Sequence, residues 1–168
     1  WKQCREESYA ALLEEQAAGR VRAVGVSNFA ERHLDELEAA GHPVPAVHQL
    51  EMHPFWIDYE LLVRHLNDGT QLMAYGCLGS KHGRAPWLRQ QGFKKIAERK
   101  NATVAQVLYR WATHHGAAVI TGGSSDAHLA ENLNFLGFEL ESSDIEFMDS
   151  NPPENMKKMY GPLPTEIL

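Results

Sequence analysis

Residues 21–54 carry the stretch VRAVGVSNFAERHLDELEAAGHPVPAVHQLEMHP, in which two short apolar runs flank one helical segment. The runs 21–26 and 46–50 are rich in Val, Ala and Leu, which is typical of buried strands. Between them, apolar residues recur at helical spacing from Leu34, and Gly41 follows as a helix stop. The stretch therefore predicts a strand, a helix and a second strand in succession.

The same alternation continues on both sides of this stretch. Upstream, we predict a helix that Gly19 ends. One face of this helix is marked by Tyr9, Leu12, Leu13, Gln16 and Ala17. Downstream, Asp58 is placed to cap a third helix, which carries Leu61, Leu62 and Leu66, and Gly69 is placed to end it. Residues 71–75 make a third strand.

Two more helices, with apolar residues in 93–97 and 104–111, precede a fourth strand at 117–121. Beyond it we expect a helix around 126–133 and a last helix capped by Ser143, with Glu146 three residues on. Residues 151–168 are predicted to be an irregular tail.

Helices that alternate with short apolar strands indicate a parallel sheet, because each crossover returns the chain to the same end of the sheet. We therefore expect an α/β fold over residues 1–150, with four parallel βα units followed by C-terminal helices.

Composition narrows the function classes. The chain has 168 residues, 43% of them hydrophobic, which suffices for one buried core. A net charge of −6 with scattered basic residues indicates neither nucleic-acid binding nor an anionic membrane surface, and no apolar run is long enough for membrane insertion. A small molecule or a protein is the expected partner.

The two cysteines, Cys4 and Cys77, lie far apart without ligand-spaced neighbours, so we predict neither a disulfide framework nor a metal site. This usage fits a reducing compartment, the cytoplasm or an organelle interior. The sequon at 101–103 is interpreted as part of a helix capping box, Thr103 with Gln106, rather than as a glycosylation site.

Motifs at the ends of the first three predicted strands carry a specific resemblance. They are GVSNF at 25–29, VHQLEMHP at 47–54 and AYGCLGS at 74–80. In this order they resemble the aldo-keto reductase family, and the resemblance extends over nearly the whole chain, through 119–120 and 131–132. It implies that the chain is the C-terminal half of a (β/α)8 TIM-type barrel.

The resemblance also implies a nicotinamide cofactor, NADP or NAD. Sites in parallel barrels form at the carboxyl ends of strands, where the matching residues fall. By resemblance, the nicotinamide carboxamide is bound by Ser27, Asn28 and Gln49, the nicotinamide ring by Tyr75, the pyrophosphate by Leu78 and Ser80, and the adenine by Glu131 and Asn132. The alternatives left open are helix caps at Ser27 and Asn28, a buried backbone partner at Gln49 and barrel packing at Tyr75.

Three positions depart from the family pattern. Gly122 and His128 stand where the family usually has the lysine and arginine that bind the 2′-phosphate of NADP, so we expect weak cofactor binding with little preference for NADP over NAD. His48 replaces an asparagine before the carboxamide-binding glutamine. We interpret it as a hydrogen-bonded core histidine rather than a rim residue.

The family's catalytic aspartate, tyrosine, lysine and histidine lie on its first four strands, and no residue of this chain matches them. We therefore assign no catalytic residue and expect this chain alone to be inactive. Two functions follow: part of an NAD(P)H-dependent reductase of aldehydes or ketones, or a non-catalytic structural subunit, a pseudoenzyme. Either way the open inner face and edges of a half-barrel need a partner, the missing N-terminal half-barrel or another protein subunit.

Overall fold

A computed structural model describes residues 1–79 and 86–150. The described residues form two compact units, one of residues 1–50 with 58–73 and the other of residues 51–57 with 74–150. They are called the first and the second unit below. Within the described ranges, none of the helices is long and apolar enough to cross a membrane.

Four strands form one sheet in the order β1-β2-β3-β4. They are β1 (Gly25–Ser27), β2 (Val47–Glu51), β3 (Gln71–Tyr75) and β4 (Ala118–Val119). The register of the parallel pair β1 and β2 sets Gly25 opposite Val47 and Ser27 opposite Gln49. An α/β fold with parallel strands is thus confirmed.

The two edge strands are shorter than predicted. The expected strand at 21–26 is paired only from Gly25, and the expected strand at 117–121 is reduced to two residues. Each edge strand has one neighbour, so fewer ladder bonds define it. Single backbone bonds extend the pairing, from Ala46 N–H to Val24 O (2.9 Å) and from Ile120 N–H to Ala74 O (2.8 Å).

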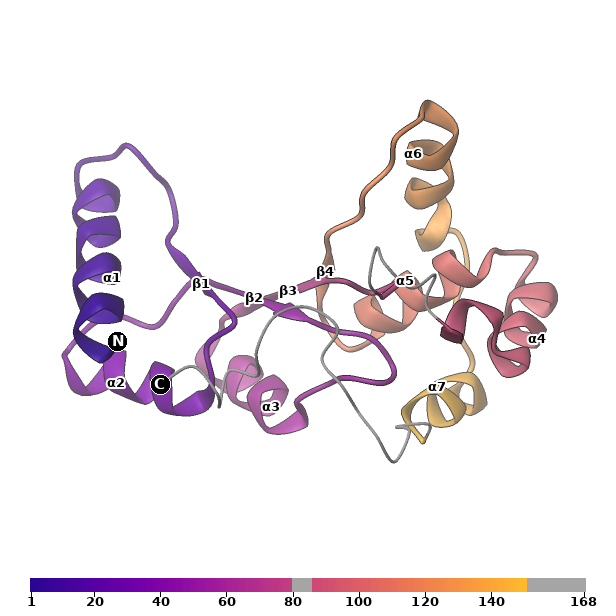
Figure 1. Cartoon of the computed structure of the whole chain (residues 1–168), viewed down its shortest axis with the longest axis horizontal. Coiled ribbons are helices and arrows are strands. Elements are labelled where there is room, and N and C mark those ends of the chain that lie inside the picture. The colour runs from indigo at the N-terminus through magenta and orange to yellow at the C-terminus, as the bar shows by residue number, and fades with distance from the viewer. Residues whose placement is uncertain (80–85, 151–168) are drawn as a thin grey trace. The chain divides into compact units, whose positions relative to one another are not determined.

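Three helices belong to the first unit: α1 (Lys2–Ala17), α2 (Glu31–Ala39) and α3 (Tyr59–Asp68) (Figure 1). Asp58 Oδ1 accepts the Leu61 N–H at 3.0 Å, and Gly69 ends α3 with a φ of 72°, so both predicted boundaries are confirmed. The core of this unit gathers Tyr9, Val24 and Leu37. Leu12, expected on the core face of α1, is instead 44% exposed.

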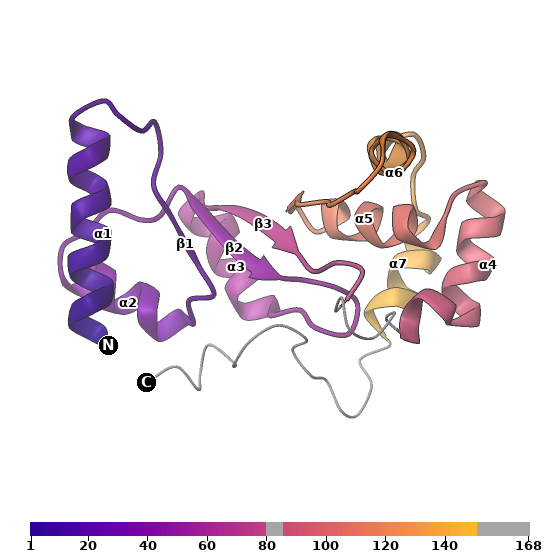
Figure 2. The same cartoon turned by 45° about the horizontal axis from the view of Figure 1, so that its top comes forward.

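The second unit contains α4 (Gln91–Lys100), α5 (Val104–His114), α6 (Asp126–Leu133) and α7 (Ser142–Asp149), with short 3-10 turns η1 (Pro86–Arg89) and η2 (Asn134–Leu136). Figure 2 shows α4, α5 and α7 gathered in this unit. Phe93, Val107, Trp111 and Met148 are fully buried and form its core. The predicted helical faces of α4 and α5 are therefore confirmed.

Helix capping in this unit confirms one prediction and corrects another. Thr103 Oγ1 accepts the Gln106 N–H (3.2 Å) while Gln106 Oε1 accepts the Thr103 N–H (2.9 Å), which completes the predicted capping box. Ser143, by contrast, is not a cap but lies inside α7. The helix begins two residues earlier than predicted, with Glu141 as its N-cap, and the buried Asp144 accepts the Glu141 N–H at 3.1 Å.

Candidate cofactor-binding site

The turn that follows β1 is held against β2. Asn28 N–H donates to Gln49 O at 3.0 Å, and Ser27 Oγ donates to the same carbonyl at 3.2 Å. Asn28 has a φ of 56°, a left-handed conformation that asparagine tolerates better than most residues. The structure thus brings together Ser27, Asn28 and Gln49, three residues that the sequence assigned to one role.

The close approach of the two strands depends on Gly25. A Cβ at this position would lie 2.5 Å from Val47 O and 3.0 Å from Val47 Cβ. Only glycine therefore allows the pairing that sets Ser27 opposite Gln49.

The side chains at this end of the strands remain accessible. Ser27 is exposed, and Asn28 and Gln49 are half-buried. Neither Ser27 nor Asn28 caps the next helix, because α2 begins after Ala30, whose N–H donates to His33 Nδ1 at 3.1 Å. The capping alternative for these two residues is therefore wrong.

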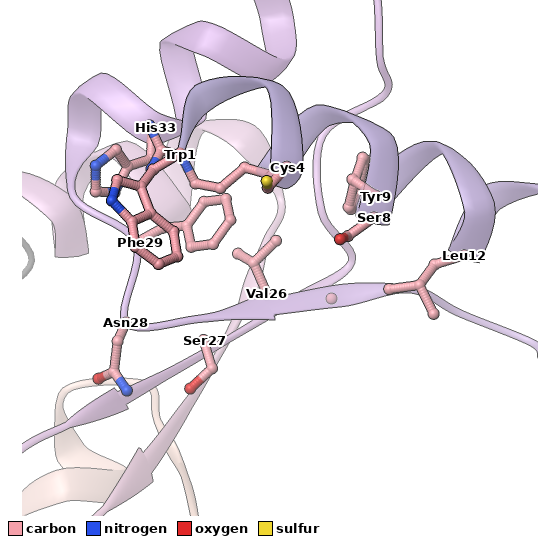
Figure 3. A pocket seen from close by; sticks show the side chains of 12 residues that line it. Trp1, Cys4, Ser8, Tyr9, Leu12, Val26, Ser27, Asn28, Phe29 and His33 are labelled. Carbon is pink, nitrogen blue, oxygen red and sulfur yellow. The ribbon is translucent and has the colours of Figure 1, made fainter. Parts of the chain in front are cut away.

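A separate groove of about 380 Å³ lies between α1 and β1 in the first unit (Figure 3). Its wall is mostly apolar, with Tyr9, Leu12, Val26 and Phe29 among its residues. Ser27 and Asn28 border it, but their side chains point away from α1 (Figure 3). This groove was not predictable from local sequence patterns, because the residues that form it are scattered from Trp1 to His33.

His48 is a core histidine, as interpreted from the sequence. Its ring is fully buried, its Nε2 accepts the Phe29 N–H at 3.0 Å, and its Nδ1 lies 2.8 Å from His65 Nε2. The pairing of His48, on β2, with His65, on α3, was not predictable because no local pattern links the two positions.

In the second unit, Tyr75 is the last residue of β3 and is half-buried. Its carbonyl accepts the Met52 N–H at 3.1 Å. Leu78 follows in a tight turn in which Gly79 N–H donates to Gly76 O at 2.7 Å, and both glycines have positive φ. Ser80 lies outside the described residues.

Cys77, in the same turn, is buried. Burial raises the pKa of its thiol to about 12, so this cysteine is a packing residue and not a nucleophile.

Glu131 and Asn132, on α6, are anchored in the second unit. Asn132 Nδ2 donates to Gly122 O at 3.2 Å, and Glu131 O accepts from Gln106 Nε2 at 2.8 Å. Asn132 thus fixes the loop after β4. This role was missed in the sequence, since it depends on a contact across ten residues.

Two of the three positions that depart from the family pattern lie near the start of α6. Gly122 and His128 are both exposed, and Ser125 Oγ caps the helix by accepting the His128 N–H at 3.3 Å. A Cβ on Gly122 would meet nothing within 4 Å, so no packing constraint requires glycine there. Asp126 adds a negative charge to the first turn.

Comparison with known proteins connects this geometry to a family. The family model described as the aldo/keto reductase family matches residues 2–151. Glyoxal reductase from Bacillus subtilis is 33% identical over 163 residues, which cover 97% of this chain and 56% of that protein. Aldose reductase B of Dictyostelium discoideum is 33% identical over 132 residues, 79% of this chain and 42% of its own length.

Solved structures agree in fold. A substituted form of Gox0644 in complex with NADPH superposes with a TM-score of 0.81 at 32% identity, covering 94% of this chain and 56% of that one. MGS-M4, an aldo-keto reductase from a Medee basin deep-sea metagenome library, gives a TM-score of 0.84 at 28% identity over 92% of this chain and 56% of its own. The chain spans about half the length of these relatives. It belongs to the aldo/keto reductase family.

Proposed function

We propose that this chain is the C-terminal half of a (β/α)8 barrel and supplies much of a nicotinamide-binding rim for NAD(P)H-dependent reduction of aldehydes or ketones. The observation that carries the proposal is the shared position of Ser27, Asn28 and Gln49 on two paired strands. Gox0644, a structural relative at 32% identity, has been solved with NADPH.

The chemistry of these three residues fits a carboxamide. That group presents one carbonyl acceptor and two N–H donors. Two amide side chains and a hydroxyl offer both donors and acceptors. Ser27 Oγ donates its proton to Gln49 O, so its lone pairs remain for a ligand N–H. When bound, the cofactor supplies the hydride, and these residues orient the nicotinamide.

In the second unit, the proposal assigns Tyr75 to the ring face, Leu78 and Ser80 to the pyrophosphate, and Glu131 and Asn132 to the adenine. The donor set around the 2′-phosphate position is poor. Gly122 offers no charge and His128 no permanent one, while Asp126 is a nearby anion. We therefore expect weak binding with little preference for NADP over NAD.

Calorimetry on the intact protein tests this cofactor assignment. Gln49→Ala removes side-chain hydrogen bonds of about 0.5–1.5 kcal/mol each, so we expect a loss in affinity of about fivefold. Gln3→Ala, a matched change on the exposed face of α1, leaves affinity unchanged. Equal affinity in wild type and Gln49→Ala would remove the carboxamide assignment.

Restoring the missing charges provides a test in the other direction. Gly122→Lys with His128→Arg adds charge-assisted hydrogen bonds worth about 1.5–3 kcal/mol each, which raises NADPH affinity tenfold or more while NADH affinity stays the same. If the wild type instead binds NADPH tightly and NADH weakly, another cation of the protein binds the 2′-phosphate.

A partner completes the proposal. β1 and β4 are the edges of the sheet, and the groove of about 380 Å³ beside β1 is lined mainly by apolar side chains. An N-terminal half-barrel, or another protein subunit, would cover these edges and supply the catalytic residues. We expect a contact of more than about 1,000 Å². Light scattering on residues 1–168 alone tests it, and a stable dilute monomer with cooperative unfolding would contradict the half-barrel.

The second candidate is a non-catalytic structural subunit of a larger assembly. Gly122 and His128 favour it, because both 2′-phosphate cations are missing at positions that are open and exposed. Consumption of NADPH with an aldehyde by the intact protein supports the reductase. Absence of that activity, together with absence of cofactor binding, supports the subunit.

A further inference from the structure

Two buried histidines connect the candidate carboxamide-binding turn to α3. Phe29 N–H, directly after Asn28, donates to His48 Nε2 at 3.0 Å, and His48 Nδ1 lies 2.8 Å from His65 Nε2. The His48 and His65 side chains are 0% and 2% exposed. Both belong to the first unit, as do Ser27 and Asn28.

The hydrogen bonds fix where the ring protons lie. A backbone N–H can only donate, so His48 Nε2 is an acceptor and carries no proton. In a neutral ring the proton is then on His48 Nδ1, which donates to His65 Nε2. His65 is left with its proton on Nδ1, a buried atom without a hydrogen-bond partner among the described residues.

This chain of hydrogen bonds ends at the turn that positions Ser27 and Asn28, the residues proposed to bind the carboxamide. β2 holds the turn in two ways, through Gln49 O, which accepts from Asn28 N–H and Ser27 Oγ, and through the His48 ring, which accepts from Phe29 N–H. Asn28 lies between these attachments with its φ of 56°. Loss of the hydrogen bond from Phe29 N–H to His48 removes the attachment that follows Asn28. The left-handed conformation of Asn28 is less stable than the right-handed one for any L-residue, so the turn would then be free to relax.

We propose that the His48–His65 pair is a positioning device for the Ser27–Asn28 turn, and that it makes nicotinamide binding depend on the pair being uncharged. The pH dependence rests on the proposed function, whereas the positioning rests on the geometry alone. A protonated His48 has N–H groups on both nitrogens and no acceptor for Phe29. A protonated His65 donates from Nε2, so His48 Nδ1 becomes the acceptor and the His48 proton moves to Nε2, where it faces the Phe29 N–H.

The groups around His65 favour its uncharged form. Burial is the largest influence and lowers the pKa of His65, and Arg64 acts in the same direction, while Asp68 and Asp58 oppose them. Arg64 is itself paired with acidic residues of α2 and α3, namely Glu31, Asp35, Glu38 and Asp68. From α2, the His33 ring contacts Phe29 edge-on.

The geometry is tested by NMR on the 168-residue chain, together with whatever partner it requires. Both contacts are N–H···N hydrogen bonds, so 15N–15N couplings should appear between Phe29 N and His48 Nε2 and between His48 Nδ1 and His65 Nε2. The coupling between Phe29 N and His48 Nε2 should disappear as the pair is protonated. Absence of the couplings at pH 7.5 overturns the positioning role.

The functional consequence is tested by NADPH and NADH affinity between pH 7.5 and 5. In the wild type, the dissociation constant should rise tenfold per pH unit below the pKa of the pair. His48→Gln places an uncharged amide oxygen at the position of Nε2, so it should bind within about threefold of wild type at pH 7.5 and lose this pH dependence. His48→Leu lacks any acceptor and should bind about tenfold more weakly at every pH.

His42→Gln is the matched control, a half-buried histidine of the same unit that packs on Tyr9, and it should keep the wild-type profile. If His48→Gln keeps the wild-type pH dependence, the pair does not govern binding. If the wild type binds neither cofactor at any pH while both couplings are present, the proposed function fails and the positioning of the turn stands.

Discussion

Replacement of Gly25 by alanine tests the strand contact on which the site depends. The added Cβ would lie 2.5 Å from Val47 O, about 0.9 Å short of the 3.4 Å at which ordinary contact begins. Because the obstacle is backbone, no side-chain rotation relieves it. β1 must move away from β2 at the residue two positions before Ser27.

The magnitude follows from the bonds nearby. Overpacking of this kind costs about 1–3 kcal/mol. A displacement of the same size would stretch the 3.0 Å bond from Asn28 N–H to Gln49 O beyond hydrogen-bond range, which adds about 0.5–1.5 kcal/mol. We expect Gly25→Ala to lower the free energy of unfolding by about 1.5–4.5 kcal/mol.

Urea unfolding at fixed protein concentration measures this loss, and calorimetry measures the accompanying drop in cofactor affinity. Gly122→Ala is the matched control, because its Cβ would meet nothing within 4 Å, and it should change stability by less than about 0.5 kcal/mol. Equal stability of Gly25→Ala and wild type would refute the account of how β1 and β2 approach each other.

Three further predictions concern single side chains. Thr103→Ala removes the acceptor for the Gln106 N–H and should cost about 1 kcal/mol in urea unfolding, whereas Thr103→Ser should cost little; equal losses would contradict the capping role. Iodoacetamide under native conditions should label the exposed Cys4 and not Cys77, whose thiol pKa burial raises to about 12; rapid labelling of both, read by mass spectrometry, would contradict its burial. Because the pKa of His65 is lowered from 6.5 in the folded chain, the unfolded chain binds the proton first, so stability should fall as pH decreases below 6.5, and His65→Gln should reduce this slope.

The sequence predicted the helices and the inner strands well, because these elements carry their own signals. α3 begins after Asp58 and stops at Gly69 through side-chain and backbone preferences that act within a few residues. β3 matches its predicted bounds at 71–75. The signal is local, so the prediction does not need the tertiary structure.

The edge strands β1 and β4 and the N-terminal cap of α7 were predicted less well, because they depend on residues that are distant in the sequence. β1 and β4 are short because each has one neighbour in the sheet. Ser143 looked like a cap, but the N-cap is Glu141, whose N–H donates to Asp144, and the buried Asp144 carboxylate pairs with Arg99 and Lys100 of α4. No pattern within α7 reveals partners that come from more than forty residues away.

For the site, the motifs predicted which residues take part but not all the contacts that hold these residues in place. Ser27, Asn28 and Gln49 meet as expected, because the carboxyl ends of parallel strands lie at one edge. The partner of His48 on α3 and the bond from Asn132 to Gly122 were not predictable, since each depends on how separate elements pack.

A crystal structure of the intact protein with NADPH or NADH tests the central proposal most directly. The account predicts that the carboxamide lies within hydrogen-bond distance of Ser27, Asn28 and Gln49, with the nicotinamide ring on Tyr75. A cofactor bound elsewhere, or another protein covering these three side chains with no cofactor present, would contradict it.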